Sequence, residues 1–340
     1  MNEARRSTAL SGGGLLEIRG LEVSFDHESS RPARAVRGID LALGPGESLA
    51  LVGESGSGKT AAVKSIMRLH DRRNARVSGS ILVEGRDIAA LSERDMEGLR
   101  GRVISMIFQD PMTSLNPVFR VGYQVAEAVS RARGLARRPA RAEALALFAK
   151  AGMPSPEILF RRYPHEFSGG MLQRAMILIA LAASPRLLIA DEPTTALDVT
   201  VQAQILQLVE EQRRALGTAL ILVTHDIGVV AERTERAAVM YAGRIVEAGP
   251  TVELLKAPRH PYTEGLLDSL PGREVRGARL RTIEGSAPGV FEEHPGCPFA
   301  PRCRYVAHRC RSEAPAFAYL GAGRGAACHR AGELSLRGIG

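Results

Sequence analysis

Residues 53–60 of the chain read Gly53-Glu54-Ser55-Gly56-Ser57-Gly58-Lys59-Thr60. This segment matches the phosphate-binding loop pattern G-x-x-x-x-G-K-[ST] at every position. In such a loop, consecutive backbone N–H groups surround a triphosphate, the lysine reaches its β- and γ-phosphates, and the threonine hydroxyl binds Mg²⁺. A short apolar run (residues 48–52) precedes the loop, and apolar residues at helical spacing follow it over residues 61–69. A strand, a glycine-rich turn and a helix in this order predict a nucleotide-binding site.

The composition is that of an ordinary soluble protein, with 24% charged and 45% hydrophobic residues, and 340 residues are enough for more than one domain. The net charge of +8 comes mostly from scattered arginines without interleaved aromatic residues, which favours a solvated or membrane-facing surface over nucleic-acid binding. The sequence has no apolar run of membrane-spanning length, and residues 1–13 lack the apolar core of a signal peptide. We therefore expect a cytoplasmic chain whose membrane spans, if it needs any, belong to other subunits.

Hydrophobic patterning predicts an α/β fold. Residues 15–25 and 35–43 alternate apolar and polar side chains, as half-buried antiparallel strands do. Residues 186–190 and 219–224 are continuous apolar runs, which are typical of parallel strands covered on both faces. Residues 120–152 are rich in alanine and arginine at helical spacing, and they predict a helical insertion.

Polar residues follow the predicted strands at the positions where a nucleotide site needs them. Asp191 and Glu192 end an apolar strand, so we expect Asp191 to hold Mg²⁺ and Glu192 to polarise the attacking water. His225 follows another strand and is placed to donate a hydrogen bond to the γ-phosphate, although a lone histidine there is more often structural. Gln109 follows a third strand and could contact Mg²⁺ or water. Each of these two is ambiguous by itself.

A second helix N-terminus suited to anions is predicted at Ser168-Gly169-Gly170. Ser168 is a good N-cap, and the two glycines leave backbone N–H groups accessible. The segment lies about twenty residues before the Asp191-Glu192 strand end, and this spacing strengthens an otherwise weak signal.

The chain resembles the nucleotide-binding subunits of ABC transporters, because it carries their motifs in their order: the phosphate loop, Gln109, Ser168-Gly169-Gly170, Asp191-Glu192, Ala196-Leu197-Asp198 and His225. The resemblance implies a P-loop NTPase core of ABC type with an antiparallel β subdomain and a helical subdomain. It implies ATP and Mg²⁺, with Thr60, Gln109 and Asp191 on the metal and Glu192, His225 and Gln109 in hydrolysis. It also implies a head-to-tail dimer in which Ser168, Gly169 and Gly170 act on the partner's ATP and Asp198 lies at the dimer contact. Phe25 corresponds to the aromatic residue that stacks on adenine, with a core-facing strand residue as the alternative.

The resemblance is closest to the branch that imports dipeptides, oligopeptides and nickel. It is carried by residues 108–117, 163–171 and 190–200, by His260-Pro261-Tyr262-Thr263 and by the cysteine-containing tail. Leu172 departs from the arginine usual in this branch. The resemblance implies a peripheral subunit on the cytoplasmic face of the inner membrane that works with a second, homologous ATPase, two permeases and an external solute-binding protein, and with no nucleic acid.

We therefore expect an ATPase that energises import of di- or oligopeptides. Nickel chelates or glutathione as cargo remain alternatives, as does a homodimer. A soluble ABC ATPase that acts on DNA or the ribosome is a remoter alternative, because the chain has neither a long coiled-coil insertion nor a second cassette.

All four cysteines lie late in the chain, at Cys297, Cys303, Cys310 and Cys328. Their wide spacing is a weak metal signal on its own. Four thiolates could bind a [4Fe–4S] cluster, and members of this branch with the same tail do so. Zinc, with His294, His308 and His329 nearby, and four unligated thiols are the alternatives. We expect a flexible N-terminal tail (1–13), an ABC ATPase domain (14–271) with its helical subdomain at about 112–170, and a small Cys-rich C-terminal domain (272–340).

Overall fold

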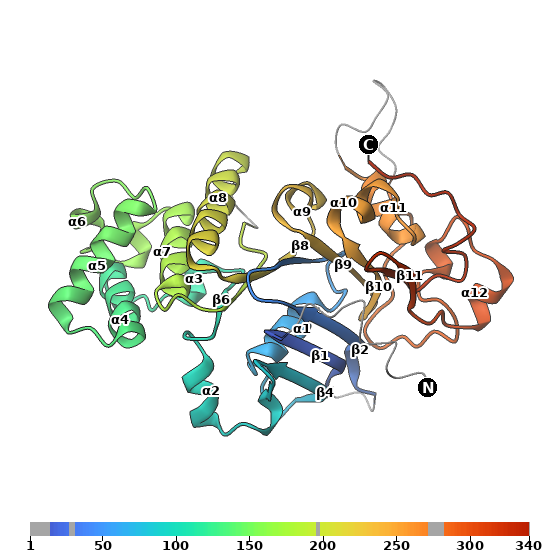
Figure 1. The fold of residues 1–340 in the computed structure, drawn as a ribbon, viewed down its shortest axis with the longest axis horizontal. Helices are drawn as coiled ribbons and strands as arrows, with labels where there is room; N and C mark the ends of the chain where they lie inside the picture. Colours follow the sequence, from blue (N-terminus) through green and yellow to red (C-terminus); the bar gives the residue numbers. More distant parts are fainter. Residues whose placement is uncertain (1–13, 27–30, 195–197, 271–281, 340) are drawn as a thin grey trace. The chain divides into compact units, whose positions relative to one another are not determined.

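The computed structural model describes residues 14–26, 31–194, 198–270 and 282–339 (Figure 1). The predicted N-terminal tail, Ala196, Leu197 and the first part of the Cys-rich domain lie outside these residues. The chain divides into two compact units, one formed by residues 1–90 and 222–340 and the other by residues 91–221.

An antiparallel sheet opens the first unit, with β1 (Leu16–Phe25), β2 (Ala33–Leu43), β4 (Ala75–Val83) and β5 (Arg86–Asp87) in the order β2-β1-β4-β5. The alternation predicted for residues 15–25 and 35–43 has its physical basis here, since Leu16, Ile18, Leu21 and Val23 of β1 are buried and Glu22 between the last two is exposed. The predicted antiparallel strands are confirmed.

A second group of strands in the first unit carries the phosphate loop. Strand β3 (Ser48–Val52) pairs in parallel with β9 (Arg236–Tyr241), and β10 (Arg244–Pro250) returns antiparallel to β9. The C-terminal tail extends this sheet, because β12 (Arg324–Ala326) pairs with β10, and β11 (Ala318–Gly321) pairs with β12. The helices of this unit are α1 (Lys59–Ile66), α9 (Ile227–Arg233), α10 (Thr251–Lys256), α11 (Pro261–Asp268) and α12 (His308–Ser312), with short 3₁₀ turns η1 (Ile88–Ala90) and η3 (Ala300–Arg302).

One hydrophobic core joins this sheet to the tail. Val52 of β3, Tyr241 of β9, Tyr262 of α11 and Phe299 of the tail all belong to it. The ring centroids of Tyr241 and Tyr262 are 4.6 Å apart, and the Phe299 ring meets both at about right angles or a steep tilt. The tail therefore shares the core of the sheet from which the phosphate loop emerges.

The second unit is mainly helical. Its strands β6 (Ile104–Ile107) and β7 (Leu187–Asp191) pair in parallel and are fully buried, as their apolar sequence predicts. Its helices are α2 (Glu93–Leu99), α3 (Pro111–Ser114), α4 (Val121–Arg133), α5 (Arg137–Lys150), α6 (Pro156–Leu159), α7 (Gly169–Leu181) and α8 (Val199–Leu216), with the 3₁₀ turn η2 (Pro164–Glu166). Strand β8 (Ala219–Thr224) spans the division between the units.

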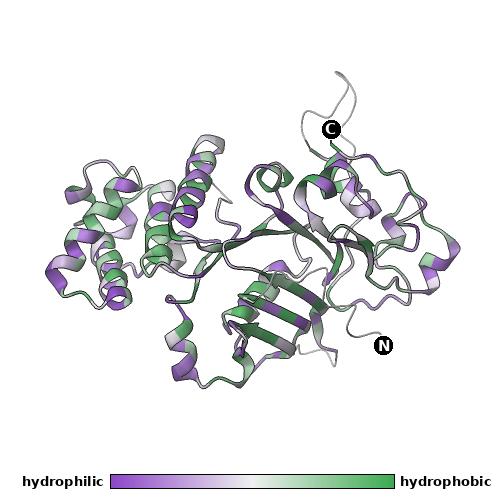
Figure 2. Cartoon of the chain, viewed as in Figure 1, coloured by the Kyte–Doolittle hydropathy of each residue, from purple (hydrophilic) through white to green (hydrophobic). Residues whose placement is uncertain are grey.

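Helix α7 differs from its neighbours in being apolar around most of its circumference (Figure 2). Helix α4 instead has a buried stripe at helical spacing, Val121, Val125 and Val129, and it ends at Gly134 in the left-handed conformation. The parallel strands, the antiparallel sheet and the helical region confirm the predicted α/β class. Within the described residues, each helix is either too short or too polar to span a membrane.

Candidate ATP-binding site

The phosphate loop follows directly from buried strand β3 and leads into α1. Gly58 is the N-cap residue of α1, with φ +101. A Cβ atom there would lie 2.3 Å from the carbonyl oxygen of Ala35, and a Cβ on Gly53 would lie 2.2 Å from that of Met240. Close packing of backbone on backbone therefore requires glycine at both positions.

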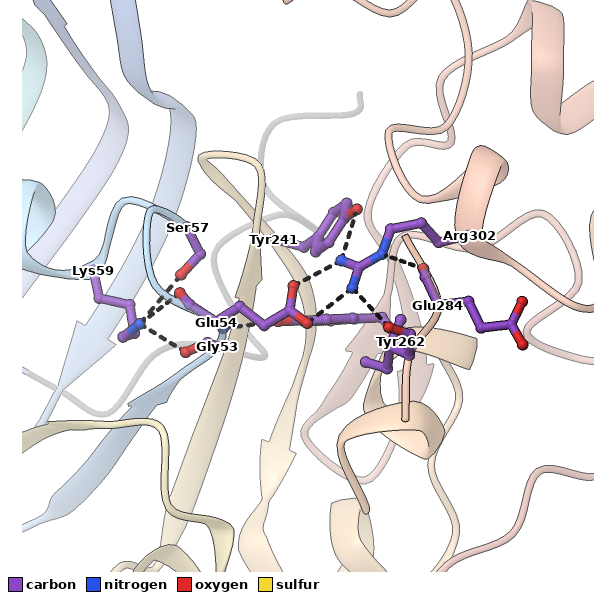
Figure 3. Close-up of polar contacts among 9 residues, drawn as sticks. Gly53, Glu54, Ser57, Lys59, Tyr241, Tyr262, Glu284 and Arg302 are labelled. Atoms are coloured by element: carbon purple, nitrogen blue, oxygen red, sulfur yellow. Dashed lines mark hydrogen bonds and ion pairs between the residues drawn. The ribbon is translucent and has the colours of Figure 1, made fainter. Parts of the chain in front are cut away.

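Lys59 lies inside the turn of the loop (Figure 3). Its side chain is buried, and Nζ donates to the carbonyl oxygens of Gly53 at 2.7 Å and Glu54 at 2.9 Å. These contacts hold the ammonium group within the loop, close to the backbone N–H groups that the pattern assigns to phosphate. The predicted order of strand, glycine-rich turn and helix is thus confirmed, and phosphate binding by residues 53–60 stays a prediction.

Phe25, the predicted adenine-stacking residue, ends strand β1 and is half-buried. Its ring meets the ring of His70 edge-on, with centroids 5.4 Å apart. His70 lies with Nε2 2.9 Å from the carbonyl oxygen of Ala61, and burial lowers its pKa. Because the Phe25 ring contacts His70 edge-on and is only half-buried, its position is consistent with stacking on adenine. That role stays a prediction.

His225 is exposed and directly follows β8. The residues on either side fix the backbone around it. The N–H of Asp226 donates to Thr224 Oγ1 at 3.0 Å, and the Asp226 carboxylate caps α9 by accepting from Gly228 N–H at 2.8 Å. His225 thus directly follows strand β8, as the sequence predicted, and its backbone neighbours are fixed by these hydrogen bonds. Its role at the γ-phosphate stays a prediction.

In the second unit, the structure brings Gln109 and Glu192 together. Gln109 Nε2 donates to Glu192 Oε2 at 3.3 Å. Asp191 is buried at the end of β7, and Glu192 has φ +47, in the left-handed region that few non-glycine residues adopt. Backbone strain of this kind concentrates at functional positions, which is consistent with the predicted role of Glu192.

The predicted signature segment forms a helix N-terminus, as expected. Ser168 caps α7, and its Oγ accepts from the N–H of Met171 at 3.4 Å. Asp198 caps α8 in the same way, accepting from Val201 N–H at 3.0 Å. A Cβ on Gly170 would lie 2.7 Å from Val201 Cγ1, so the start of α7 packs closely against α8.

A groove in the second unit was not identified from the sequence as a cavity, although it falls in the helical insertion. It has a volume of about 1020 Å³ and is lined by aromatic, aliphatic and arginine side chains. Val118, Phe119 and Tyr123 are among them and are exposed, with Val118 70% accessible. Exposed aromatic residues in a concave surface are typical of a protein-binding site.

The four cysteines line one small cavity of about 20 Å³ beside His260. Burial raises the pKa of Cys297 and of Cys303 to about 11, and the pKa of Cys328 is raised in the same way. Four thiols lining one cavity are the type of ligand that a [4Fe–4S] cluster or a four-cysteine zinc site requires. Within the described residues, however, no three or more His, Cys, Asp or Glu side chains are grouped so as to hold a metal ion.

Comparison with known proteins agrees with this architecture. Residues 36–195 match the ABC transporter family model, and residues 246–310 match the model of the oligopeptide/dipeptide transporter C-terminal region. A probable peptide ABC transporter ATP-binding protein of Sinorhizobium fredii is 48% identical over 322 residues, covering 94% of this chain and 96% of that protein. The dipeptide transport ATP-binding protein DppD of Bacillus subtilis is 48% identical over 290 residues, covering 85% and 86%.

Solved structures share the fold. CbiO1 of Clostridium perfringens, part of the CbiONQ ABC transporter complex, is 28% identical, with a TM-score of 0.59 over 71% of this chain and 90% of that chain. The cassette MJ0796, solved as a dimer bound to ADP and Pi, is 24% identical, with a TM-score of 0.62 over 70% and 99%. Extensive identity over nearly the whole chain, together with this fold, places the protein in the family of ABC transporter ATP-binding proteins.

Proposed function

We propose that this chain is the ATP-hydrolysing subunit of an importer for di- or oligopeptides. One observation carries the proposal: a phosphate loop with a buried, inward-held Lys59 occurs in a chain whose C-terminal region matches that of oligopeptide and dipeptide transporters. Relatives named for peptide and dipeptide transport match along most of their length, which supports peptides over nickel chelates or glutathione as cargo.

In the proposed mechanism the loop amides and Lys59 bind the β- and γ-phosphates of ATP. Thr60, Asp191 and Gln109 would hold Mg²⁺, which neutralises phosphate charge when bound. Glu192 would orient and deprotonate the attacking water, and His225 would donate a hydrogen bond to the γ-phosphate.

The second half of each ATP site would come from a second ATPase subunit. The N-terminus of α7, with Ser168 capping it and Gly169 and Gly170 exposing N–H groups, would meet the γ-phosphate bound by the partner. Asp198 would lie at the dimer contact. Closure on ATP and reopening after hydrolysis would then drive the membrane subunits between two states.

The groove beside α4 would receive the membrane permease. An amphipathic segment of the permease would place apolar side chains against Phe119 and Tyr123, while Arg120 and Arg161 at the groove supply polar contacts. The chain would therefore act as a peripheral protein on the cytoplasmic face of the inner membrane, in a complex with two permeases and an external solute-binding protein.

We also propose that the four thiolates of the tail hold a [4Fe–4S] cluster, with zinc as the alternative. The support is that all four cysteines face one cavity. The cluster would serve structure or regulation, because ATP-driven transport needs no electrons. Anaerobic purification should give a brown protein with broad visible absorption and about four iron atoms per chain. Zinc without iron, or no metal, would reject the cluster.

The function is tested by changing Glu192. The Glu192→Gln variant should bind ATP and form a stable ATP-bound dimer, but its turnover should fall by at least about a hundredfold. The cargo is tested in cells that lack the native subunit, by expressing this chain and measuring uptake of labelled dipeptides, nickel and glutathione in matched assays. Expression should restore uptake of dipeptides only. Undiminished hydrolysis by Glu192→Gln would show that Glu192 is not the base, and uptake of another cargo would redefine the substrate.

A further inference from the structure

The C-terminal tail contacts the phosphate loop directly, through Arg302 (Figure 3). Arg302 ends the 3₁₀ turn η3, next to Cys303, and its side chain is only 6% exposed. Its Nη1 lies 2.7 Å from Glu54 Oε2, and Nη2 lies 3.0 Å from Glu54 Oε1. The guanidinium therefore binds the Glu54 carboxylate through two parallel hydrogen bonds, the strongest geometry for this pair of groups.

The tail and the sheet also fix Arg302 itself. Its Nε donates to the carbonyl oxygen of Glu284 at 3.0 Å, and Nη1 contacts the hydroxyl of Tyr241 at 3.4 Å. A side chain with several fixed partners loses little further freedom on binding Glu54. Arg302 is therefore a rigid anchor for Glu54.

Tyr262 holds the backbone of the same loop residue. Its hydroxyl accepts from the N–H of Glu54 at 2.8 Å, and its ring is completely buried against Tyr241 and Phe299. Both the side chain and the main chain of Glu54 are thus held by residues that lie far later in the sequence. The carbonyl of this same residue accepts from Lys59 Nζ, so the restraint reaches the phosphate-binding lysine.

We infer that Arg302 is a positioning residue for ATP binding, which ties the phosphate loop to the Cys-rich tail through Glu54. The inference rests on the proposed function, because it assigns a role to tail residues at the proposed ATP site. A loop already held in one conformation binds its ligand more tightly, since less freedom is lost on binding. Removing the anchor should therefore weaken ATP binding without altering the residues that perform the chemistry.

The decisive variant replaces both charges at once. Arg302→Gln alone would leave an unpaired carboxylate near the phosphates. Weaker ATP binding could then come from electrostatic repulsion rather than from a displaced phosphate loop. The double variant Arg302→Gln/Glu54→Gln keeps the net charge and removes the two parallel charged hydrogen bonds. Arg304→Gln is the matched control, because Arg304 is also a tail arginine but pairs with Glu264 and Asp268 of α11 and not with Glu54.

Binding of MgATP to the full-length chain is measured by calorimetry, and the ATPase kinetics are measured in the assembled transporter. The double variant should bind ATP about tenfold more weakly, with a raised KM and unchanged kcat. Tyr262→Phe should shift KM in the same direction, and Arg304→Gln should bind ATP like the wild type.

Wild-type affinity in the double variant, or an equal loss in Arg304→Gln, would overturn the inference. A lower kcat at unchanged KM would also overturn it, because that indicates fewer folded molecules. Lys59→Ala separates the two proposals: if this variant still binds ATP normally, the ATP site itself is wrongly assigned.

Discussion

Glu247 should make the stability of the folded chain vary strongly with pH. This residue lies on β10 and is 1% exposed. Its carboxylate accepts hydrogen bonds from the backbone N–H groups of Arg259 at 2.7 Å and His260 at 2.9 Å, and Arg324 lies 3.7 Å away. Burial nevertheless outweighs these contacts and raises the pKa of Glu247 from 4.5 to about 7.

Whether the free energy of unfolding rises or falls with pH depends on which state binds the proton. Between pH 4.5 and about 7 the folded chain holds a proton on Glu247 that the unfolded chain has lost. The free energy of unfolding contributed by this group is therefore greatest below pH 4.5 and falls as pH rises, by about 3 kcal/mol over the window. His260 acts in the opposite sense, because burial lowers its pKa from 6.5 to about 3, so its contribution rises with pH up to 6.5.

Comparison with the Glu247→Gln variant separates the two groups, since His260 is present in both proteins. Urea unfolding of the full-length chain is measured at pH 5 and pH 8. The stability of the wild type relative to Glu247→Gln should be about 2.5 kcal/mol greater at pH 5 than at pH 8, slightly less than over the whole window because pH 5 lies above the unfolded pKa. Glu253→Gln, on the adjacent helix α10, controls for loss of a carboxylate. A relative stability that is constant between the two pH values, or that rises with pH, would refute the reasoning.

Further predictions concern backbone packing and helix caps. Gly58→Ala should abolish ATP binding, measured by calorimetry, because its Cβ would lie 2.3 Å from the Ala35 carbonyl oxygen at a φ of +101. Gly170→Ala should lower stability by about 1–3 kcal/mol, because its Cβ would lie 2.7 Å from Val201 Cγ1 and overpack the contact. Asp198→Ala should cost about 1 kcal/mol in urea unfolding through loss of the α8 cap, whereas Asp198→Asn should cost less because its side chain still accepts from Val201 N–H.

Local patterns predicted most of the elements around the site. The run before the phosphate loop is β3, the run before Asp191 is β7, and Ser168 caps α7 as expected. These features depend on a few consecutive residues, because burial on both faces requires continuous apolar sequence and an N-cap requires a short polar side chain. The predicted roles of Gln109 and Glu192 in hydrolysis remain predictions, and their hydrogen bond supports them.

Features that depend on distant residues were not predicted. The edge contact of His70 with Phe25 and the groove around Phe119 and Tyr123 arise from the arrangement of several elements. Neither a single histidine nor two aromatic residues on a helical insertion gives a sequence pattern that identifies such a contact. The four cysteines differ from these features, because the sequence already singled them out together and in the fold they line one cavity. A metal at that cavity stays a prediction.

The contact between Glu54 and Arg302 is not indicated by the phosphate-loop motif, although the motif itself is complete. The phosphate-loop pattern leaves the position of Glu54 unspecified because backbone N–H groups, not that side chain, bind phosphate. A side chain at an unspecified position can therefore take another partner without loss of the motif. In this chain the partner is Arg302, which follows 248 residues later, and Tyr262 holds the backbone at the same point. No sequence pattern marks Glu54 and Arg302 as partners, whereas in the fold Tyr241, Tyr262 and Phe299 share one core beside them. Because that core also contacts Cys297 and Cys303, a change at the thiol cavity has a direct physical route to the phosphate loop.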